Sequence, residues 1–379
     1  MARLVRIAGC GLILAATGCV TPQATQAPAP IIVATPAATQ AAAPAAERVR
    51  WASSIVSRDA AWYSSPEARA IADSVLLYQS REGGWPKNTD LSVPPRSAAD
   101  LPPANMSNTI DNNGTTLPMQ FLARVIQATG DARYVQAFNR GFDYLIAAQY
   151  PNGGWPQFYP LREGYYSRIT FNDDAIVRVA RLLRDAAEGE EQFAFVDPQR
   201  RAIAAAAVAR TTDLILRTQI VQNGRRTAWA AQYDERTLAP APARAFEPAS
   251  LSGSESVGIV RFLMSIDDPS PEVIAAVEGA VQWFQDVRIT GMRLEDFTDA
   301  QGQPDKRLVP DAAAEPLWAR FYDLRTNRPI FTSRDAVIHD RYDQIERERR
   351  TGYAFIGTWP AQLLAREYPR WRQRVGRSG

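Results

Sequence analysis

Apolar residues recur with a helical period along most of the chain beyond residue 50. In seven windows they return at every third or fourth position, which is typical of an α-helix with one buried face. The windows are 68–77, 121–127, 135–148, 175–183, 203–216, 257–264 and 273–284. Strict alternation of apolar and polar residues, which is typical of strands, is scarce. The pattern therefore predicts an all-α domain.

A segment that follows a predicted helix recurs seventy residues later. QSREGGWPK at residues 79–87 is matched in shape by QYPNGGWPQ at residues 149–157, and a degenerate third copy is expected at residues 222–229. Glycine permits the turn that ends a helix, and proline stops its continuation. Repeats of two helices bury their apolar faces only against neighbouring repeats. We therefore predict an α/α barrel, or toroid, of helical hairpins, complete or incomplete, with few short strands. Trp85 and Trp155, just after the turns, fit core packing and a functional role equally well.

The first 47 residues differ in composition from the rest. Two arginines precede a short apolar run at residues 7–16, which predicts an export signal over residues 1–19 that is too short to span a bilayer. The tetrapeptide ATGC at residues 16–19 leaves open a lipid anchor at Cys19 or ordinary secretion. Residues 20–47 are rich in Pro, Ala and Thr and predict an extended linker. The folded domain is expected over residues 48–379, in a secreted, periplasmic or outer-membrane-anchored protein.

Composition narrows the chemistry of that domain. Both cysteines, Cys10 and Cys19, lie in the predicted signal, so no disulfide or thiol chemistry is expected. The single histidine, His339, cannot furnish a zinc site with two or three histidines. The basic residues are nearly all arginine, without a polybasic run, so no nucleic-acid partner is expected. No feature indicates a protein partner, and a monomer is expected.

Two short polar clusters, at residues 109–116 and 170–174, each precede a predicted helix. Capping of the helix accounts for one or two of their Asp and Asn residues, but not for all of them. Six side chains supply the oxygen that a hard cation such as calcium prefers. They are Asp111, Asn112, Asn113, Asn172, Asp173 and Asp174. A calcium site would have to be assembled from these distant segments. Paired carboxylates would also permit glycoside hydrolysis, and clustered arginines indicate an anionic substrate.

Seven motifs occur in an order that is specific to one family. They are GGWPKN at 83–88, TIDNNGT at 109–115, GGWPQ at 153–157, TFNDDA at 170–175, ARAFE at 243–247, SLSGSESVG at 250–258 and RFYDL at 320–324. Over residues 64–368 the chain resembles the family 10 pectate lyases in these motifs. The resemblance implies an irregular α/α barrel. It also implies calcium-assisted β-elimination of α-1,4-polygalacturonate, which gives 4,5-unsaturated oligogalacturonates.

The resemblance also implies roles for single residues. Arg244 matches the family's catalytic arginine, the base that removes the C5 proton, and Asp111 matches its essential aspartate. Asp173 matches the calcium-coordinating aspartate, with Asp111 and Asn112 as further ligands of Ca²⁺. The candidates for binding uronate carboxylates are Lys87, Arg320 and Arg334. A guanidinium with a pKa above ~12 is a poor base near neutrality, so nearby cations or an alkaline optimum are needed.

The chain departs from the family pattern at Gly114, where Ala is frequent, and at Pro118, which is tolerable in a first helical turn. Two other interpretations remain open at this point. The first is a glycoside hydrolase on an α/α toroid, acting on uronic-acid oligosaccharides with Asp111 and Asp173. The second is a tethered surface protein that holds pectic oligosaccharides without cleaving them.

Overall fold

The computed structural model describes residues 48–189 and 191–378. By its internal contacts the chain divides into two units, Met1–Arg48 and Val49–Gly379, and the second is described here. The predicted signal (1–19), the linker (20–47) and Cys19 lie outside the described residues, so export and the lipid anchor stay predictions. Within the described ranges, no helix is both long and apolar enough to cross a bilayer.

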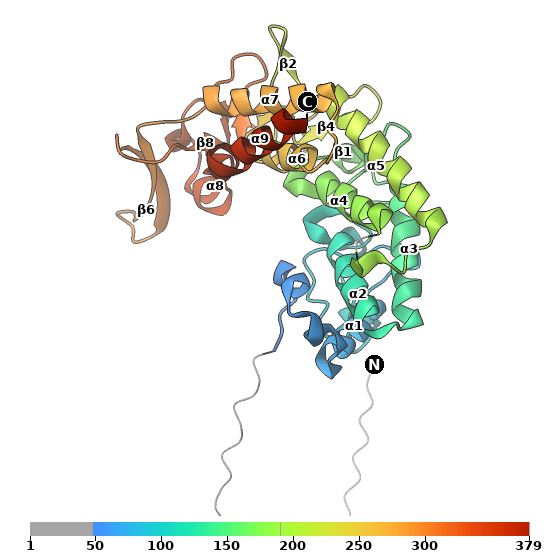
Figure 1. Cartoon of the computed structure of the whole chain (residues 1–379). Helices are drawn as coiled ribbons and strands as arrows, with labels where there is room; N and C mark the ends of the chain where they lie inside the picture. Colours follow the sequence, from blue (N-terminus) through green and yellow to red (C-terminus); the bar gives the residue numbers. More distant parts are fainter. Residues whose placement is uncertain (1–47, 190, 379) are drawn as a thin grey trace, which may run out of the picture. The chain divides into compact units, whose positions relative to one another are not determined.

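All seven helices predicted from periodicity are present, and Figure 1 shows them in chain order from blue to orange. They are α1 (Pro66–Leu77), α2 (Thr116–Thr129), α3 (Ala132–Ala148), α4 (Ala175–Glu188), α5 (Pro198–Thr218), α6 (Glu255–Met264) and α7 (Pro271–Asp286). Three of them begin with proline directly after a Ser or Asp cap, as at Ser65, whose side chain accepts a hydrogen bond from the Ala68 amide. Helices α2 and α4 are capped at their C-terminal ends by Gly130 and Gly189, both in the left-handed conformation.

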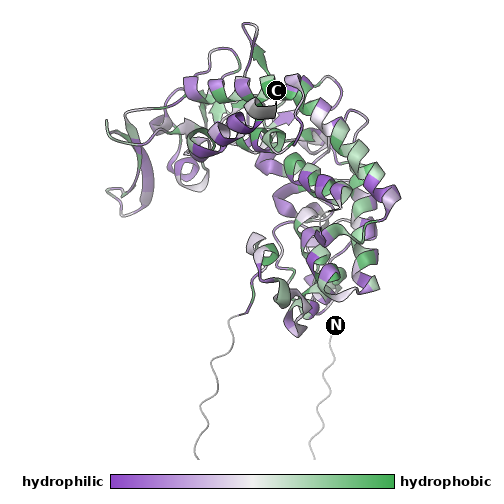
Figure 2. Ribbon diagram, in the orientation of Figure 1, coloured by the Kyte–Doolittle hydropathy of each residue, from purple (hydrophilic) through white to green (hydrophobic). Residues whose placement is uncertain are grey.

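The helices pack in consecutive pairs, α2 with α3, α4 with α5 and α6 with α7. Hydrophobic and hydrophilic faces alternate around them in Figure 2, and buried apolar side chains from all of these helices form one core. The prediction of a mainly helical fold of hairpins with few short strands is confirmed. Closure of the hairpins into a barrel stays a prediction.

The repeat is visible in the hydrogen bonds of its turns. The amide of Gln79 donates to the carbonyls of Gly83 and Ala137, and Gln149 does the same one repeat later. In the third repeat the equivalent amide is that of Gln219, which donates to the carbonyls of residues 227 and 276. The expected start of the third copy at residue 222 is therefore wrong by three positions, because a longer hairpin replaces the glycine turn.

The tryptophan that follows each turn is part of the core. Trp85, Trp155 and Trp229 are fully buried, and their indole N–H groups donate to the carbonyls of the preceding helices. A buried indole needs such a partner, so these rings anchor the turns onto the helix ends. Core packing is thus the correct interpretation of Trp85 and Trp155.

Gly153 allows one of these turns to approach α5 closely. Its φ is +95°, and a β-carbon there would lie 2.3 Å from the carbonyl oxygen of Arg210. We expect Gly153→Ala to lower the free energy of unfolding by about 2–4 kcal/mol, because left-handed strain and a backbone clash add. Urea unfolding measures this, with Gly130→Ala as the control. Gly130 also has positive φ but has no atom within 4 Å of the added carbon, so only the strain should remain. Equal losses in the two variants would contradict the role of the close approach.

Short strands tie together the loops between the helices. β1 (Ile169–Thr170) pairs with β4 (Gln232–Tyr233), and β5 (Leu251–Ser252) pairs with β9 (Phe321–Tyr322), all antiparallel. The remaining two-residue strands are β2 (Val221–Gln222), β3 (Arg225–Arg226), β8 (Trp318–Ala319), β10 (Phe331–Thr332), β11 (Ile338–His339) and β12 (Ile356–Gly357). They pair as β2–β3, β8–β12 and β10–β11. The β1–β4 and β5–β9 pairs each fix a segment that leads into the site described below.

One substantial hairpin was not predicted from the sequence. It consists of β6 (Met292–Thr298) and β7 (Pro304–Pro310), and Figure 2 shows hydrophilic residues along much of it. Its side chains are mostly half-buried or exposed, so the hairpin lacks the alternation of a strand with one buried face. Two short helices, α8 (Arg347–Gly352) and α9 (Tyr368–Ser378), were missed as well, and α8 packs on β7.

Candidate active site

Two turns of the same unusual shape begin the site. The turn Asp111–Asn113 (η5) precedes α2, and the turn Asn172–Asp174 (η7) precedes α4. Asn112 and Asp173 occupy equivalent positions, with φ of 47° and 49°, and the residue after each also has positive φ. Asn and Asp adopt this left-handed conformation more readily than other side chains. The two turns lie against each other, as a calcium site assembled from both polar clusters requires.

Asp111 is buried at the edge of this meeting point. Its Oδ2 accepts hydrogen bonds from Lys87 Nζ at 2.5 Å and from Gln157 Nε2 at 2.7 Å. Its Oδ1 is also buried but has no hydrogen-bond partner among the described residues. A buried carboxylate oxygen without a partner is costly, so this atom is available to a ligand. Lys87, predicted to bind substrate, is thus an ion-pair partner of Asp111 here.

Asn112, Asp173 and Arg320 line one cleft of about 320 Å³. Asp173 Oδ1 accepts a hydrogen bond from Arg320 Nη2 at 2.9 Å, and Oδ2 accepts one from Asn172 Nδ2 at 2.7 Å. The side chain of Asp173 is 42% exposed, whereas that of Arg320 is only 12% exposed. Three of the predicted site residues are therefore together, with an arginine already on the carboxylate.

Glu255 binds the same nitrogen of Arg320, Nη2, as Asp173 does. Its carboxylate is 1% exposed and accepts hydrogen bonds from the guanidinium of Arg320 and from the hydroxyl of Ser252. Burial opposes the charge on Arg320, but the carboxylates of Glu255 and Asp173 and the nearby Tyr353 raise its pKa overall. Arg320 is consequently a fixed cation that faces the cleft.

Asp174 lines the same cleft, and burial raises the pKa of its carboxyl. A β-carbon on Gly258 of α6 would lie 2.0 Å from Asp174 Oδ1. Glycine at that position leaves the room that the aspartate occupies between α4 and α6. The sequence singled out Asp174 only as part of its cluster.

Arg244 lies in a second cluster. Its Nε donates to Glu247 Oε2 at 2.9 Å, its Nη2 donates to Oε1, and its guanidinium lies 4.9 Å from the centre of the Phe246 ring. The hydrogen bonds that Arg244 donates to Glu247 outweigh partial burial and raise the pKa of Arg244. Arg334 lies 4.9 Å from the same ring and pairs with Glu348. The two arginines are 48% and 54% exposed, so a substrate can reach both.

Tyr353 connects the two clusters. Its hydroxyl donates to Glu247 Oε1 at 3.1 Å, and its ring centre lies 5.1 Å from the guanidinium of Arg320. A continuous path of contacts therefore leads from Arg244 through Glu247 and Tyr353 to Arg320 and so to the cleft. Sequence reasoning missed Glu247, Glu255 and Tyr353 as site residues. The two glutamates lie inside motifs that it did quote, whereas Tyr353 lies in none of them.

Comparison with known proteins decides the family. The family model for pectic acid lyase matches residues 79–364 of the chain. The chain belongs to the pectic acid lyase family. Two solved structures of a family 10 polysaccharide lyase from Cellvibrio cellulosa are similar to it, each with a TM-score of 0.71 and covering 84% of this chain. One is a mutant in complex with trigalacturonic acid, 35% identical over 96% of that protein, and the other is 36% identical over 95%. No curated protein matches the sequence.

The chain is accordingly a polysaccharide lyase with pectate lyase activity. The two alternative interpretations, a glycoside hydrolase and a non-enzymatic binder, are therefore set aside. The roles of single residues and the calcium requirement stay predictions. Among the described residues of this lyase, no group of three or more His, Cys, Asp or Glu side chains is arranged to hold a metal ion. A calcium ion would therefore depend on amide oxygens, water or substrate as well as on carboxylates.

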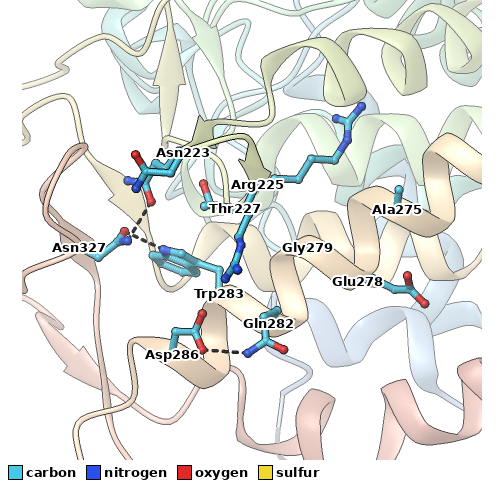
Figure 3. Close-up of a pocket in the computed structure, with 12 residues that line it drawn as sticks. Asn223, Arg225, Thr227, Ala275, Glu278, Gly279, Gln282, Trp283, Asp286 and Asn327 are labelled. Atoms are coloured by element: carbon cyan, nitrogen blue, oxygen red, sulfur yellow. Dashed lines mark hydrogen bonds between the residues drawn. The ribbon is translucent and has the colours of Figure 1, made fainter.

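A larger pocket of the lyase, about 820 Å³, lies apart from all of these residues, between the β2–β3 hairpin and α7 (Figure 3). In the first two repeats an arginine of the second helix, Arg140 or Arg210, bonds to the turn glutamine. In the third repeat Arg226 of β3 bonds to Gln219 instead, and Gly279 of α7 leaves room for it. The replacement of a helix arginine by Arg226 accounts for the pocket. We assign the pocket no part in the reaction.

Proposed function

We propose that this lyase cleaves α-1,4-polygalacturonate by calcium-assisted β-elimination and releases 4,5-unsaturated oligogalacturonates. The observation that supports it best is the joining of arginines and acidic oxygens in one site. Arg244 and Arg334 are accessible at one end, while Asp173, Asn112 and Arg320 line a cleft at the other. The trigalacturonate complex of the Cellvibrio relative supports a uronide substrate.

The reaction needs a base, charge neutralisation and a leaving group. The C5–H bond breaks and its electron pair forms the C4–C5 double bond. The C4–O bond breaks, and the glycosidic oxygen leaves with that electron pair and takes a proton from solvent water. In this proposal Arg244 accepts the C5 proton. Glu247 disfavours that role in the geometry described, because its carboxylate stabilises the protonated guanidinium.

Binding of the uronate carboxylate is assigned to Arg320 and Arg334, with Lys87 as a further positive charge beside Asp111. A guanidinium presents two parallel N–H groups that match a carboxylate, and such charge-assisted pairs are stronger than neutral hydrogen bonds. Arg320 is suited to this because its ion pair with the buried Glu255 fixes its orientation. Substrate contact would then replace the bond that Arg320 makes to Asp173.

The donors in the site fit calcium in chemical type. Asp111 Oδ1 is buried without a partner, and Asn112 and Asp173 present further oxygen atoms at the two turns that meet. Carboxylate and amide oxygens are the ligands that calcium takes. A cation at Asp173 competes with the guanidinium of Arg320 for Oδ1. When bound, calcium supplies positive charge to the substrate carboxylate and makes the adjacent C5 proton more acidic.

The test is digestion of polygalacturonate with absorbance of the unsaturated uronide as the readout. We expect absorbance to rise with added calcium. EDTA should slow the reaction by about 10²-fold or more, because several kcal/mol of charge stabilisation is lost. Excess calcium should restore the rate, which separates metal removal from denaturation. Reducing ends without absorbance would overturn the elimination mechanism, and an undiminished rate in EDTA would overturn the calcium requirement.

A further inference from the structure

A buried arginine that the mechanism does not use lies behind the Arg244 cluster. Arg349 of α8 is 2% exposed. Its guanidinium carbon lies 4.2 Å from the ring centre of Phe246, 4.7 Å from that of Tyr353 and 5.2 Å from that of Phe355. Its Nε and Nη2 atoms are buried and have no hydrogen-bond partner among the described residues.

Two partly buried arginines near Arg349 are paired with carboxylates. Arg350, the next residue, bonds to the buried carboxylate of Asp305 with 2.9 and 2.5 Å contacts, and Arg320 bonds to Glu255. A buried charge without a counterion is costly, and aromatic faces offset only part of that cost. Burial, followed by the positive charges of Arg334 and Arg244, lowers the pKa of Arg349, although Glu348 and Tyr353 oppose this. Its position therefore calls for an explanation beyond packing.

The guanidinium groups of Arg349 and Arg244 both lie against the ring of Phe246. Both guanidinium carbons lie within 5 Å of the centre of Phe246, so they are within about 10 Å of each other. The other charged or titratable groups that face Arg244 are Glu247, Arg334, Tyr165 and Tyr353. Arg334 is exposed and is balanced by Glu348, so solvent and its partner screen it. Arg349 is the buried cation of this group, and it lacks a carboxylate partner among the described residues.

We propose that Arg349 is a positioning residue for the elimination, a buried cation whose field favours the neutral form of Arg244 and so opposes the effect of Glu247. The proposal rests on the proposed function, in which Arg244 is the base. Glu247 orients the guanidinium of Arg244 but stabilises its protonated form. Arg349 opposes this stabilisation without touching the substrate.

The expected effect follows from Coulomb's law. The two ring distances place the charges no more than about 9 Å apart. At an effective dielectric constant of about 20, two unit charges at that limit change a pKa by about one unit. When the positive charge of Arg349 is removed, the protonated form of Arg244 becomes more stable. The pKa of Arg244 therefore rises. The alkaline rise of kcat/KM should therefore move about one pH unit higher. At a fixed pH on that rise, the rate falls about tenfold.

The experiment compares pH profiles of kcat/KM on polygalacturonate, at saturating calcium, for the wild type, Arg349→Met and Arg349→Lys. We expect the Met variant to shift by about one unit and the Lys variant, which keeps the charge, to stay close to the wild type. Arg350→Met is the matched control, because it removes the adjacent, partly buried arginine whose charge Asp305 already neutralises. It should lower the melting temperature and leave the profile in place.

A Met profile that superimposes on the wild type would overturn the proposal, as would equal shifts in the Met and Lys variants. If Arg349→Met does not fold, Arg349→Gln also removes the charge and replaces it in the comparison. Arg244→Ala, measured in parallel, separates the two levels of the argument. Loss of activity in Arg244→Ala with no shift in Arg349→Met refutes the role of Arg349 alone. Retained activity in Arg244→Ala refutes the base assignment itself.

Discussion

Replacement of Arg244 by alanine should reduce kcat on polygalacturonate by about 10³-fold, while KM changes by less than about threefold. A positioned general base contributes about 10² to 10⁴ in rate, and the uronate carboxylate is held mainly by other groups in this site. Arg320 remains fixed by Glu255, and Arg334 remains exposed beside Phe246. Steady-state kinetics over a range of pH, with calcium in excess, measure both constants.

The matched control is Arg341→Ala. Arg341 is another exposed arginine that bonds to an acid close along the chain, Asp343. Within residues 48–189 and 191–378, no ion pair or side-chain hydrogen bond joins it to a residue of the cleft. We expect wild-type kinetics from it. Full recovery of Arg244→Ala at any pH would remove Arg244 from the role of base. A large rise in KM with little change in kcat would instead assign it to substrate binding.

The helices were predictable because each carries its own signal. Their apolar period, and the Ser-Pro or Asp-Pro pairs that open three of them, are local features of the sequence. The β6–β7 hairpin has no such signal, since neither of its faces is fully buried. The third turn was misplaced because its glycine pair is absent. Only the shared hydrogen bonds of Gln79, Gln149 and Gln219 reveal the true register.

The site was predictable where motifs mark the turns and hidden where it depends on distant partners. The polar clusters at residues 109–116 and 170–174 could be singled out from the sequence, and their turns are in contact in the structure. Glu255 lies 65 positions from Arg320, and Tyr353 lies 106 positions from Glu247, so neither pairing has a local pattern. Nothing in the sequence indicates that Arg320 and Arg334 each pair with a carboxylate of the protein itself.

Glu255→Ala is expected to lower the free energy of unfolding by about 3–5 kcal/mol. Removing one partner of a buried ion pair leaves the other charge uncompensated in a medium of low dielectric constant. Glu255 is almost wholly buried and bonds to Arg320 and to the hydroxyl of Ser252, so several groups lose their partner at once. Urea unfolding monitored by circular dichroism gives the value.

The same variant should also release Arg320 from its fixed orientation, so activity should fall even where the protein remains folded. Glu348→Ala is the comparison, because Glu348 also pairs with an arginine of the site, Arg334, but at the surface. Water replaces a lost surface partner at little cost in free energy, so the unfolding midpoint of Glu348→Ala should barely change. If Glu255→Ala proved as stable as Glu348→Ala, the buried pair would not be what holds Arg320. The shape of the cleft would then depend on the paired strands β5 and β9 instead. Strand β5 lies just before Glu255 in the chain, and β9 follows Arg320 directly.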